Sequence, residues 1–224
     1  MPRLLSRIVL AFLISTLALA CATSPPVYRP PAQASAVSDS RAVYPETAFV
    51  VITDPHVYDS SLGVTGSAFQ AYLDRDRKLL RESVEIFETA VAAAAEEAAD
   101  FVIVCGDMTK DGERVNHLLA AETLGRLTRA GKKVFVVPGN HDVANGEAVR
   151  FIGDRTEPVP TVSPEAFVDI YGDYGYKAAL DRDPTSLSYL AEPVPGLWLL
   201  AVDSCKWRLN RPGHHSPSDF RCKH

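Results

Sequence analysis

Three short apolar runs constrain the fold most strongly, because each of them stops abruptly at polar residues. The runs cover residues 48–53, 101–105 and 134–138, and their hydrophobicity is continuous rather than alternating. Continuous apolar runs of this length are typical of strands buried on both faces, as in a parallel sheet between layers of helices. The sequence therefore predicts an α/β fold.

Helical patterns lie between these runs. Apolar residues recur at close to the helical period from Phe69 to Ala98, and residues 113–130 form a second such segment that Gly131 would end. Alternating strands and helices predict a parallel sheet with right-handed crossovers. Beyond residue 143 the pattern is weaker: Ser163 before Pro164 predicts a helix start, and residues 185–204 predict two strands around a turn.

The first 20 residues predict an export signal. Arg3 and Arg7 precede thirteen mostly apolar residues, a run too short to span a bilayer. The small residues Ala18 and Ala20, on either side of Leu19, suit cleavage by a signal peptidase. Cys21 follows directly and resembles the lipidated cysteine of bacterial lipoproteins. We therefore favour a lipid anchor at the membrane surface of the cell envelope or periplasm. An ordinary secretory signal followed by an unrelated cysteine fits the same residues.

Residues 22–46 are rich in Pro, Ala and Ser and have no periodicity, which predicts a tether and leaves 47–224 as the folded domain. The net charge of −5 and the lack of a basic stripe argue against a nucleic-acid partner. Five residues separate Gly125 from Gly131, where a P-loop has four, so a nucleotide-binding loop is excluded. Pairing of Cys205 with Cys222 in an oxidising compartment is left open.

Polar residues follow every apolar run. In a parallel sheet the carboxyl ends of the strands share one edge, where α/β proteins place their sites. The residues at these ends should therefore converge, although they span almost ninety positions: Asp54, His56, Asp107, Asn140 and His141. Carboxylate, imidazole and amide ligands suit divalent Mn, Fe or Zn. Gly106 and Gly139 would let the backbone bend and approach a ligand closely.

The segments DPH (54–56), GDMTKDG (106–112) and GNHD (139–142) together resemble the first three signature blocks of the calcineurin-like metallophosphoesterases. Those blocks read D-x-H, G-D-x-x-x-x-G and G-N-H-D/E, and the resemblance runs from about residue 48 to residue 142. It implies a layered α/β sandwich, with central sheets flanked by helices. It also implies two divalent metal ions and a phosphate-ester substrate.

The resemblance also implies a role for each residue. Asp54 and His56 would hold the first metal, Asp107 would bridge both, and Asn140 would bind the second. His141 would act on the phosphate or its leaving group, and Asp142 would orient His141. Two cations close together neutralise phosphate oxygens and lower the pKa of a bridging water. The expected activity is therefore metal-dependent hydrolysis of phosphoric esters, with monoesters and diesters both open.

The last part of the chain departs from the family pattern. The family supplies an isolated histidine and then a late G-H-x-H, and this chain, with six histidines, has no such motif. His214 or His215 is a candidate for the isolated ligand, although a polar loop pair fits equally, and His117 is expected at the surface or behind the ligands. We therefore expect a fold that is incomplete at its C-terminus. The alternative function is a truncated, catalytically inactive envelope lipoprotein that retains half of a phosphoesterase fold.

Overall fold

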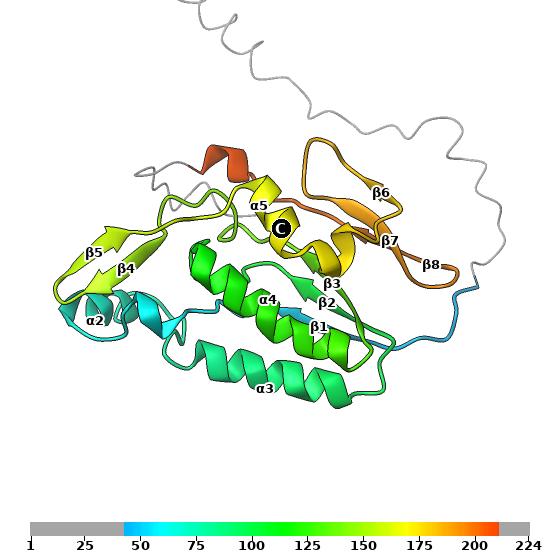
Figure 1. Ribbon diagram of the computed structural model, residues 1–224, viewed down its shortest axis with the longest axis horizontal. Coiled ribbons are helices and arrows are strands. Elements are labelled where there is room, and N and C mark those ends of the chain that lie inside the picture. The colour runs from blue at the N-terminus through cyan, green and yellow to red at the C-terminus, as the bar shows by residue number, and fades with distance from the viewer. Residues whose placement is uncertain (1–42, 211–224) are drawn as a thin grey trace, which may run out of the picture. The chain divides into compact units, whose positions relative to one another are not determined.

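Three parallel strands form the central sheet of the computed structural model, which describes residues 43–210 (Figure 1). The strands are β1 (Phe49–Thr53), β2 (Phe101–Cys105) and β3 (Lys133–Val137), and they pair in that order. The predicted α/β class with a parallel sheet is thus confirmed. The signal, the tether and Cys21 lie outside the described residues, as do His214, His215 and Cys222.

The register of this sheet aligns the carboxyl ends of its strands. Thr53 pairs with Cys105, and Cys105 in turn pairs with Val137. The segments that begin at Asp54, Gly106 and Gly139 therefore start side by side, one or two residues after these paired strand ends. This register is what brings distant parts of the sequence to one edge.

Two helices pack together and bury apolar residues against the strands. They are α3 (Ser83–Glu96) and α4 (Arg114–Arg129), which contact each other and lie side by side (Figure 1). Phe87 of α3, Leu124 of α4 and Val104 of β2 belong to one buried cluster. Burial of this cluster is the main stabilising contribution that these helices make. The helix predicted over 113–130 is confirmed, and Gly131, with φ of +81°, follows its end.

The prediction of one helical segment from Phe69 to Ala98 is wrong in one respect, because the chain forms two separate helices there. The helix α2 (Ser67–Leu73) ends before residues 74–82, and α3 begins after them. Residues 74–78 are all charged, so this stretch has no apolar side chain to bury, and Leu79 after it is 63% exposed. Charged residues in a row prefer solvent to a helix interface.

The second half of the described chain adds antiparallel pairs. A hairpin of β4 (Val149–Ile152) and β5 (Arg155–Pro158) lies beside α2, and the sequence analysis did not predict it. The helix α5 (Pro164–Ile170) begins at the expected place, where the Ser163 hydroxyl accepts a hydrogen bond from the amide of Ala166 at 3.2 Å. Two short helical segments, η3 (Gly172–Tyr176) and η4 (Trp207–Leu209), come after α5, and a third, η2 (Ser60–Leu62), lies earlier, between β1 and α2.

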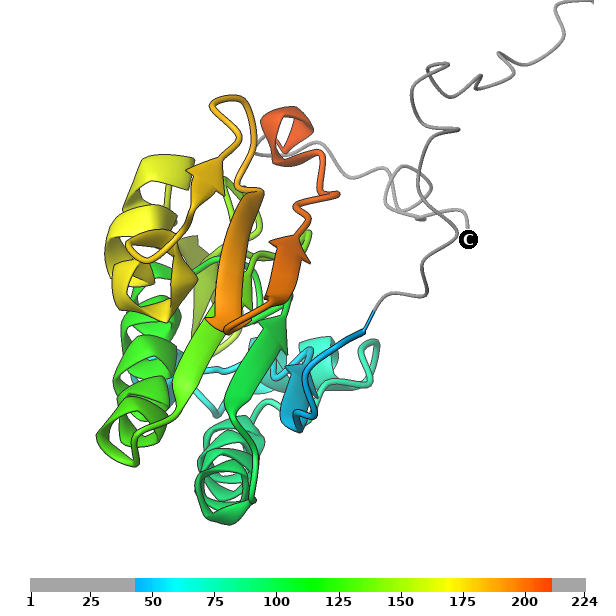
Figure 2. The same ribbon diagram turned by 90° about the vertical axis from the view of Figure 1, so that its right-hand side faces the viewer.

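A small antiparallel sheet packs next to β3. It contains β6 (Asp181–Arg182), β7 (Tyr189–Val194) and β8 (Leu197–Ala201), so the predicted pair of strands around Pro195 and Gly196 is confirmed (Figure 2). The Tyr189 hydroxyl donates to the carbonyl oxygen of Val136 at 3.0 Å, which fixes β7 to β3. Within residues 43–210, no helix has the length and apolar character needed to cross a membrane.

Candidate metal centre

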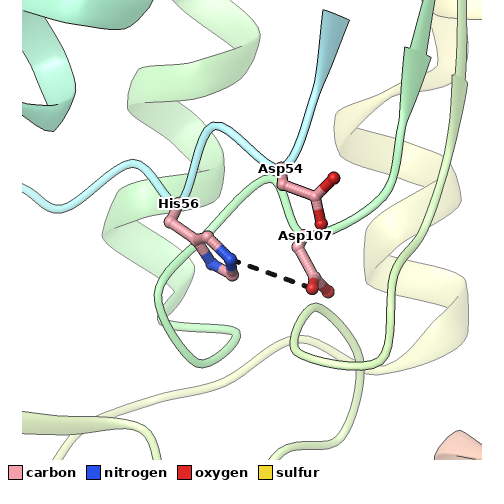
Figure 3. Close-up of side chains that lie close together, drawn as sticks. All are labelled: Asp54, His56 and Asp107. Atoms are coloured by element: carbon pink, nitrogen blue, oxygen red, sulfur yellow. Dashed lines mark ion pairs between the residues drawn. The ribbon is translucent and has the colours of Figure 1, made fainter. Parts of the chain in front are cut away.

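The predicted ligands from the first two strand ends come together. One potential ligand atom from each of Asp54, His56 and Asp107 lies within 4.8 Å of the others (Figure 3). The loops after β1 and β2 stay hydrogen-bonded beyond the strands, because the amide of His56 donates to the carbonyl oxygen of Asp107 at 3.0 Å. The His56 Nε2 and Asp107 Oδ2 atoms are 3.9 Å apart. Backbone pairing thus holds a carboxylate and an imidazole at coordination distance.

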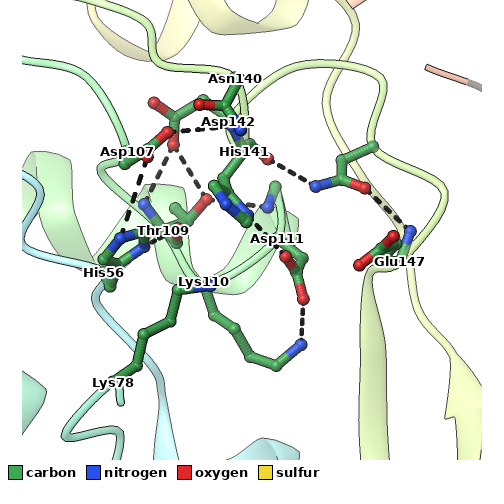
Figure 4. A network of polar contacts seen from close by, with 12 residues as sticks. His56, Lys78, Asp107, Thr109, Lys110, Asp111, Asn140, His141, Asp142 and Glu147 are labelled. Atoms are coloured by element: carbon green, nitrogen blue, oxygen red, sulfur yellow. Dashed lines mark hydrogen bonds and ion pairs between the residues drawn. The ribbon is translucent and has the colours of Figure 1, made fainter. Parts of the chain in front are cut away.

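Asn140, from the loop after β3, lies on the same side of the site. It lines a cavity of about 450 Å³ together with Asp54 and Asp107, and Figure 4 shows it next to Asp107. The amide of the following residue, His141, donates to Asp107 Oδ1 at 3.0 Å. The third strand end therefore reaches the group formed by the first two, as the sequence predicted. Two carboxylates, an imidazole and an amide oxygen suit Mn, Fe or Zn better than a soft metal.

The three clustered residues have an unusual backbone conformation. The φ angle is +52° at Asp54, +43° at His56 and +45° at Asp107. Non-glycine residues rarely adopt positive φ, and such strained residues concentrate at functional sites. The strained backbone thus indicates a functional site at this edge independently of any sequence motif.

Glycine is required between the second and third loops. A Cβ atom at Gly139 would lie 2.1 Å from Asp107 Oδ1 and 2.2 Å from the Asp107 amide nitrogen. Any larger residue would therefore displace Asp107, both its carboxylate and its backbone. The sequence predicted that Gly139 would approach a ligand; in the structure the group that it approaches is Asp107.

Asp142 has a different role from the expected one. Its side chain is fully buried and accepts four hydrogen bonds at 2.8–3.1 Å. The donors are the backbone amides of Met108, Thr109 and Gly139 and the Thr109 hydroxyl, so none of the four comes from His141. Burial and the neighbouring Asp107 raise the pKa of Asp142 to about 6, although the backbone amides lower it. Asp142 thus ties the loop after β3 to the loop after β2.

The side chain that contacts the His141 ring is Asp111, a residue of the segment 106–112 for which the sequence predicted no role. Asp111 Oδ1 lies 2.7 Å from His141 Nδ1. Burial lowers the pKa of His141, but the hydrogen bond to Asp111 raises it, and the pKa lies above its usual value. The expectation that Asp142 orients His141 is corrected: adjacent residues in a turn point in different directions, and Asp142 points into the backbone of the neighbouring loop.

A buried charge network holds Asp111 in turn. Its other carboxylate oxygen pairs with Lys110, which is 1% exposed and lies 3.5 Å from Glu113 Oε1. Burial raises the pKa of Asp111, but His141 and Lys110 outweigh it, so the pKa lies below the usual value. Asp111 is therefore an ionised acceptor for the His141 ring (Figure 4).

His117 is fully buried, so of its two expected positions the one at the surface is wrong and the one behind the ligands fits the structure. Its Nε2 lies 2.9 Å from the carbonyl oxygen of Asp142, and its Nδ1 lies 2.9 Å from the Tyr171 hydroxyl. A carbonyl only accepts, so Nε2 carries the proton and Nδ1 accepts from Tyr171. The ring supports the loop that contains Asn140 and His141.

This histidine makes stability depend on pH. Burial lowers the pKa of His117 to about 4, whereas the unfolded residue titrates near its ordinary value of about 6.5. Between these two pKa values the unfolded chain binds more protons at this residue than the folded chain does. The free energy of unfolding is therefore highest above about pH 6.5 and falls by about 3 kcal/mol as the pH is lowered toward 4. Urea unfolding at pH 7 and pH 4 should show a smaller loss for His117→Gln than for the wild type. Equal losses in the two proteins would contradict this assignment.

The fold and the clustered side chains together define the class of protein. It is an α/β protein with a candidate metal centre at the carboxyl ends of its parallel strands. A family model described as calcineurin-like phosphoesterase matches residues 47–194. Because this span is more than half of the chain, the protein belongs to the calcineurin-like phosphoesterase family. Membership implies a metal-dependent hydrolase of phosphoesters. The search of curated proteins found no match.

Proposed function

We propose that the protein hydrolyses phosphoric esters with a water molecule activated by two divalent metal ions. The observation that carries this proposal is the convergence of Asp54, His56 and Asp107, whose ligand atoms lie within 4.8 Å of one another. Two bound cations would neutralise the phosphate oxygens and make hydroxide accessible near neutral pH. The donor set fits this role, because Mn, Fe and Zn accept mixed carboxylate, imidazole and amide ligands.

Each ligand has an assigned role in this proposal. Asp54 and His56 would hold the first ion and Asn140 the second, and Asp107 would bridge both. A bridging carboxylate supplies negative charge between two cations and so permits their close approach. The position of Asp107 supports this role, because it is near His56 and it accepts a hydrogen bond from the loop that contains Asn140.

His141 would serve the leaving group. Its Nδ1 faces Asp111 at 2.7 Å, so Nε2 is the nitrogen available to a substrate. The ionised Asp111 favours the protonated ring, and a protonated imidazole can donate to the ester oxygen as that oxygen gains negative charge. Asp142 would act on the geometry rather than the proton, because its four hydrogen bonds fix the loop around His141.

The test is an assay of the full chain with bis-nitrophenyl phosphate and nitrophenyl phosphate. After treatment with a chelator the wild type should be inactive, and added Mn²⁺ should restore hydrolysis. The alternative, a catalytically inactive envelope protein, predicts a folded chain without hydrolysis of either ester at saturating Mn²⁺. Thermal unfolding and Mn²⁺ titration separate this outcome from a protein that is simply unfolded or unloaded.

We further infer that the chain is exported and lipid-anchored through Cys21 at the cell envelope. This inference depends on the sequence of residues 1–21, which lie outside the described residues. Stable anchoring takes two acyl signals or their equivalent. In a bacterial host, radioactive palmitate should label the wild type but not Cys21→Ala, which should move to the soluble fraction. Equal labelling of both proteins would contradict the anchor at Cys21.

A further inference from the structure

The loop between α2 and α3 brings two cationic residues to the candidate metal centre. Arg77 and Lys78 line a cavity of about 540 Å³, and Asp54 and His56 line the same cavity. This loop exists because the helical pattern breaks at residues 74–78. The cavity therefore combines the predicted ligands of one metal with positive charge from a separate segment.

The side chain of Lys78 is largely buried, but its ammonium group is weakly paired. Its side chain is 14% exposed, and its Nζ lies 3.4 Å from Asp76 Oδ2. Asp76 has other donors, because it accepts from the Tyr72 hydroxyl at 2.8 Å and from the Lys78 amide at 3.1 Å. A lysine has three N–H donors, so one long contact leaves most of its capacity available. In the described part of the chain, Arg77 forms no ion pair with a carboxylate.

The Lys78 side chain points toward both imidazoles of the site. Figure 4 shows its side chain extending toward His56 and His141, whose ring centroids are 5.3 Å apart. Metal ions held by Asp54 and His56 would place further positive charge close to the Lys78 ammonium group, which lines the same cavity, and like charges repel. An anion placed between them would reverse the sign of that interaction.

We propose that Lys78, with Arg77 beside it, forms an anion subsite that binds a phosphate oxygen of the substrate next to His141. The statement that the subsite binds a substrate ester rests on the proposed function, whereas its binding of free phosphate does not. The cavity wall also includes Leu79, Ile86 and Phe87, which suit an apolar organic group. The subsite thus favours phosphoesters whose phosphate lies at the metals and whose apolar part lies against α3.

Inorganic phosphate is the probe for this subsite, because its binding can be measured without turnover. Calorimetry on the full chain, with and without Mn²⁺, should show that Lys78→Met weakens phosphate binding about tenfold, as expected for loss of one charge-assisted hydrogen bond. Lys78→Arg should recover most of the affinity. The matched control is Lys177→Met, because Lys177 is 69% exposed and pairs with Asp173 outside the cavity. The control should bind phosphate as the wild type does.

Turnover adds a second readout. For nitrophenyl phosphate, Lys78→Met should raise KM about tenfold and change kcat less, because the subsite binds the ester in the ground state as well as in the transition state. The unfolding temperature should stay within a few degrees of the wild type, since among residues 43–210 Lys78 makes a single long ion pair.

The outcomes separate the two proposals. Unchanged phosphate affinity and unchanged KM in folded Lys78→Met would overturn the subsite, even if the wild type is an active metallohydrolase. If the wild type lacks metal-dependent hydrolysis but binds phosphate through Lys78, the subsite stands and the proposed function falls.

Discussion

Asp107→Asn is expected to abolish high-affinity Mn²⁺ binding and to lower kcat/KM by about 10³-fold or more. Asp107 lies within ligand distance of both Asp54 and His56. An amide has one neutral oxygen, so it cannot bridge two cations or offset their repulsion. Mn²⁺ titration calorimetry and the hydrolysis of nitrophenyl esters measure the two effects.

The fold should tolerate this substitution. The hydrogen bond that Asp107 Oδ1 accepts from the His141 amide at 3.0 Å can be accepted equally by an asparagine oxygen. Asp173→Asn is the matched control, because Asp173 is 75% exposed and lies outside the site. Retention of wild-type metal affinity or activity within about tenfold in Asp107→Asn would contradict the proposed centre.

Asp111→Asn is the second large prediction, and kcat should fall by about 10²-fold while Mn²⁺ affinity stays close to that of the wild type. The carboxylate supports the His141 ring at 2.7 Å and is not among the clustered ligands. An asparagine oxygen can accept the same hydrogen bond, but it has no charge to stabilise the protonated ring. Stopped assays and Mn²⁺ calorimetry on the same preparation distinguish a proton-transfer defect from a metal-binding defect.

This substitution also removes one partner of Lys110, which is buried beside Glu113. Leaving a buried ion with fewer partners destabilises a fold, so His141→Ala provides an independent measurement. Groups that act as a unit are non-additive, and the double variant should be no slower than His141→Ala alone. Multiplicative losses of kcat would show that Asp111 and His141 act separately.

The sheet, and the edge of it at which Asp54, His56 and Asp107 gather, were predictable from the sequence. Buried parallel strands leave continuous apolar runs, and β1, β2 and β3 each fall within one or two residues of such a run. Parallel pairing then requires the carboxyl ends to meet, so Asp54 and Asp107 converge without any knowledge of the helices. These inferences depend on local patterns and on one topological rule, which is why they succeeded.

The partner of His141 was not predictable in the same way. Asp142 is its neighbour in sequence, but the choice of Asp111 depends on how the turn after β2 folds over the loop after β3. Gly112 has φ of +80°, and a Cβ there would lie 2.9 Å from the Asp142 carbonyl oxygen. In the sequence, the only trace of this close approach between two loops is the glycine itself. A glycine does not indicate which group lies next to it.

The two helices between β1 and β2 show a second limit. The apolar period continues on both sides of residues 74–82, so it does not reveal the break. A run of five charges was the available signal, at residues 74–78. The hairpin of β4 and β5 was missed because its strands are short and partly exposed, with charged residues in both.

The left-handed backbone at Asp54, His56 and Asp107 has a consequence for the energetics of the whole molecule. Glycine adopts such angles without steric cost, whereas each of these side chains costs about 1 kcal/mol there. The sum of about 3 kcal/mol is a large fraction of the roughly 5–15 kcal/mol that keeps a typical domain folded. Occupancy by cations would offset that deficit through mass action. Metal supply would then govern how long the protein persists in the cell, as well as how fast it works.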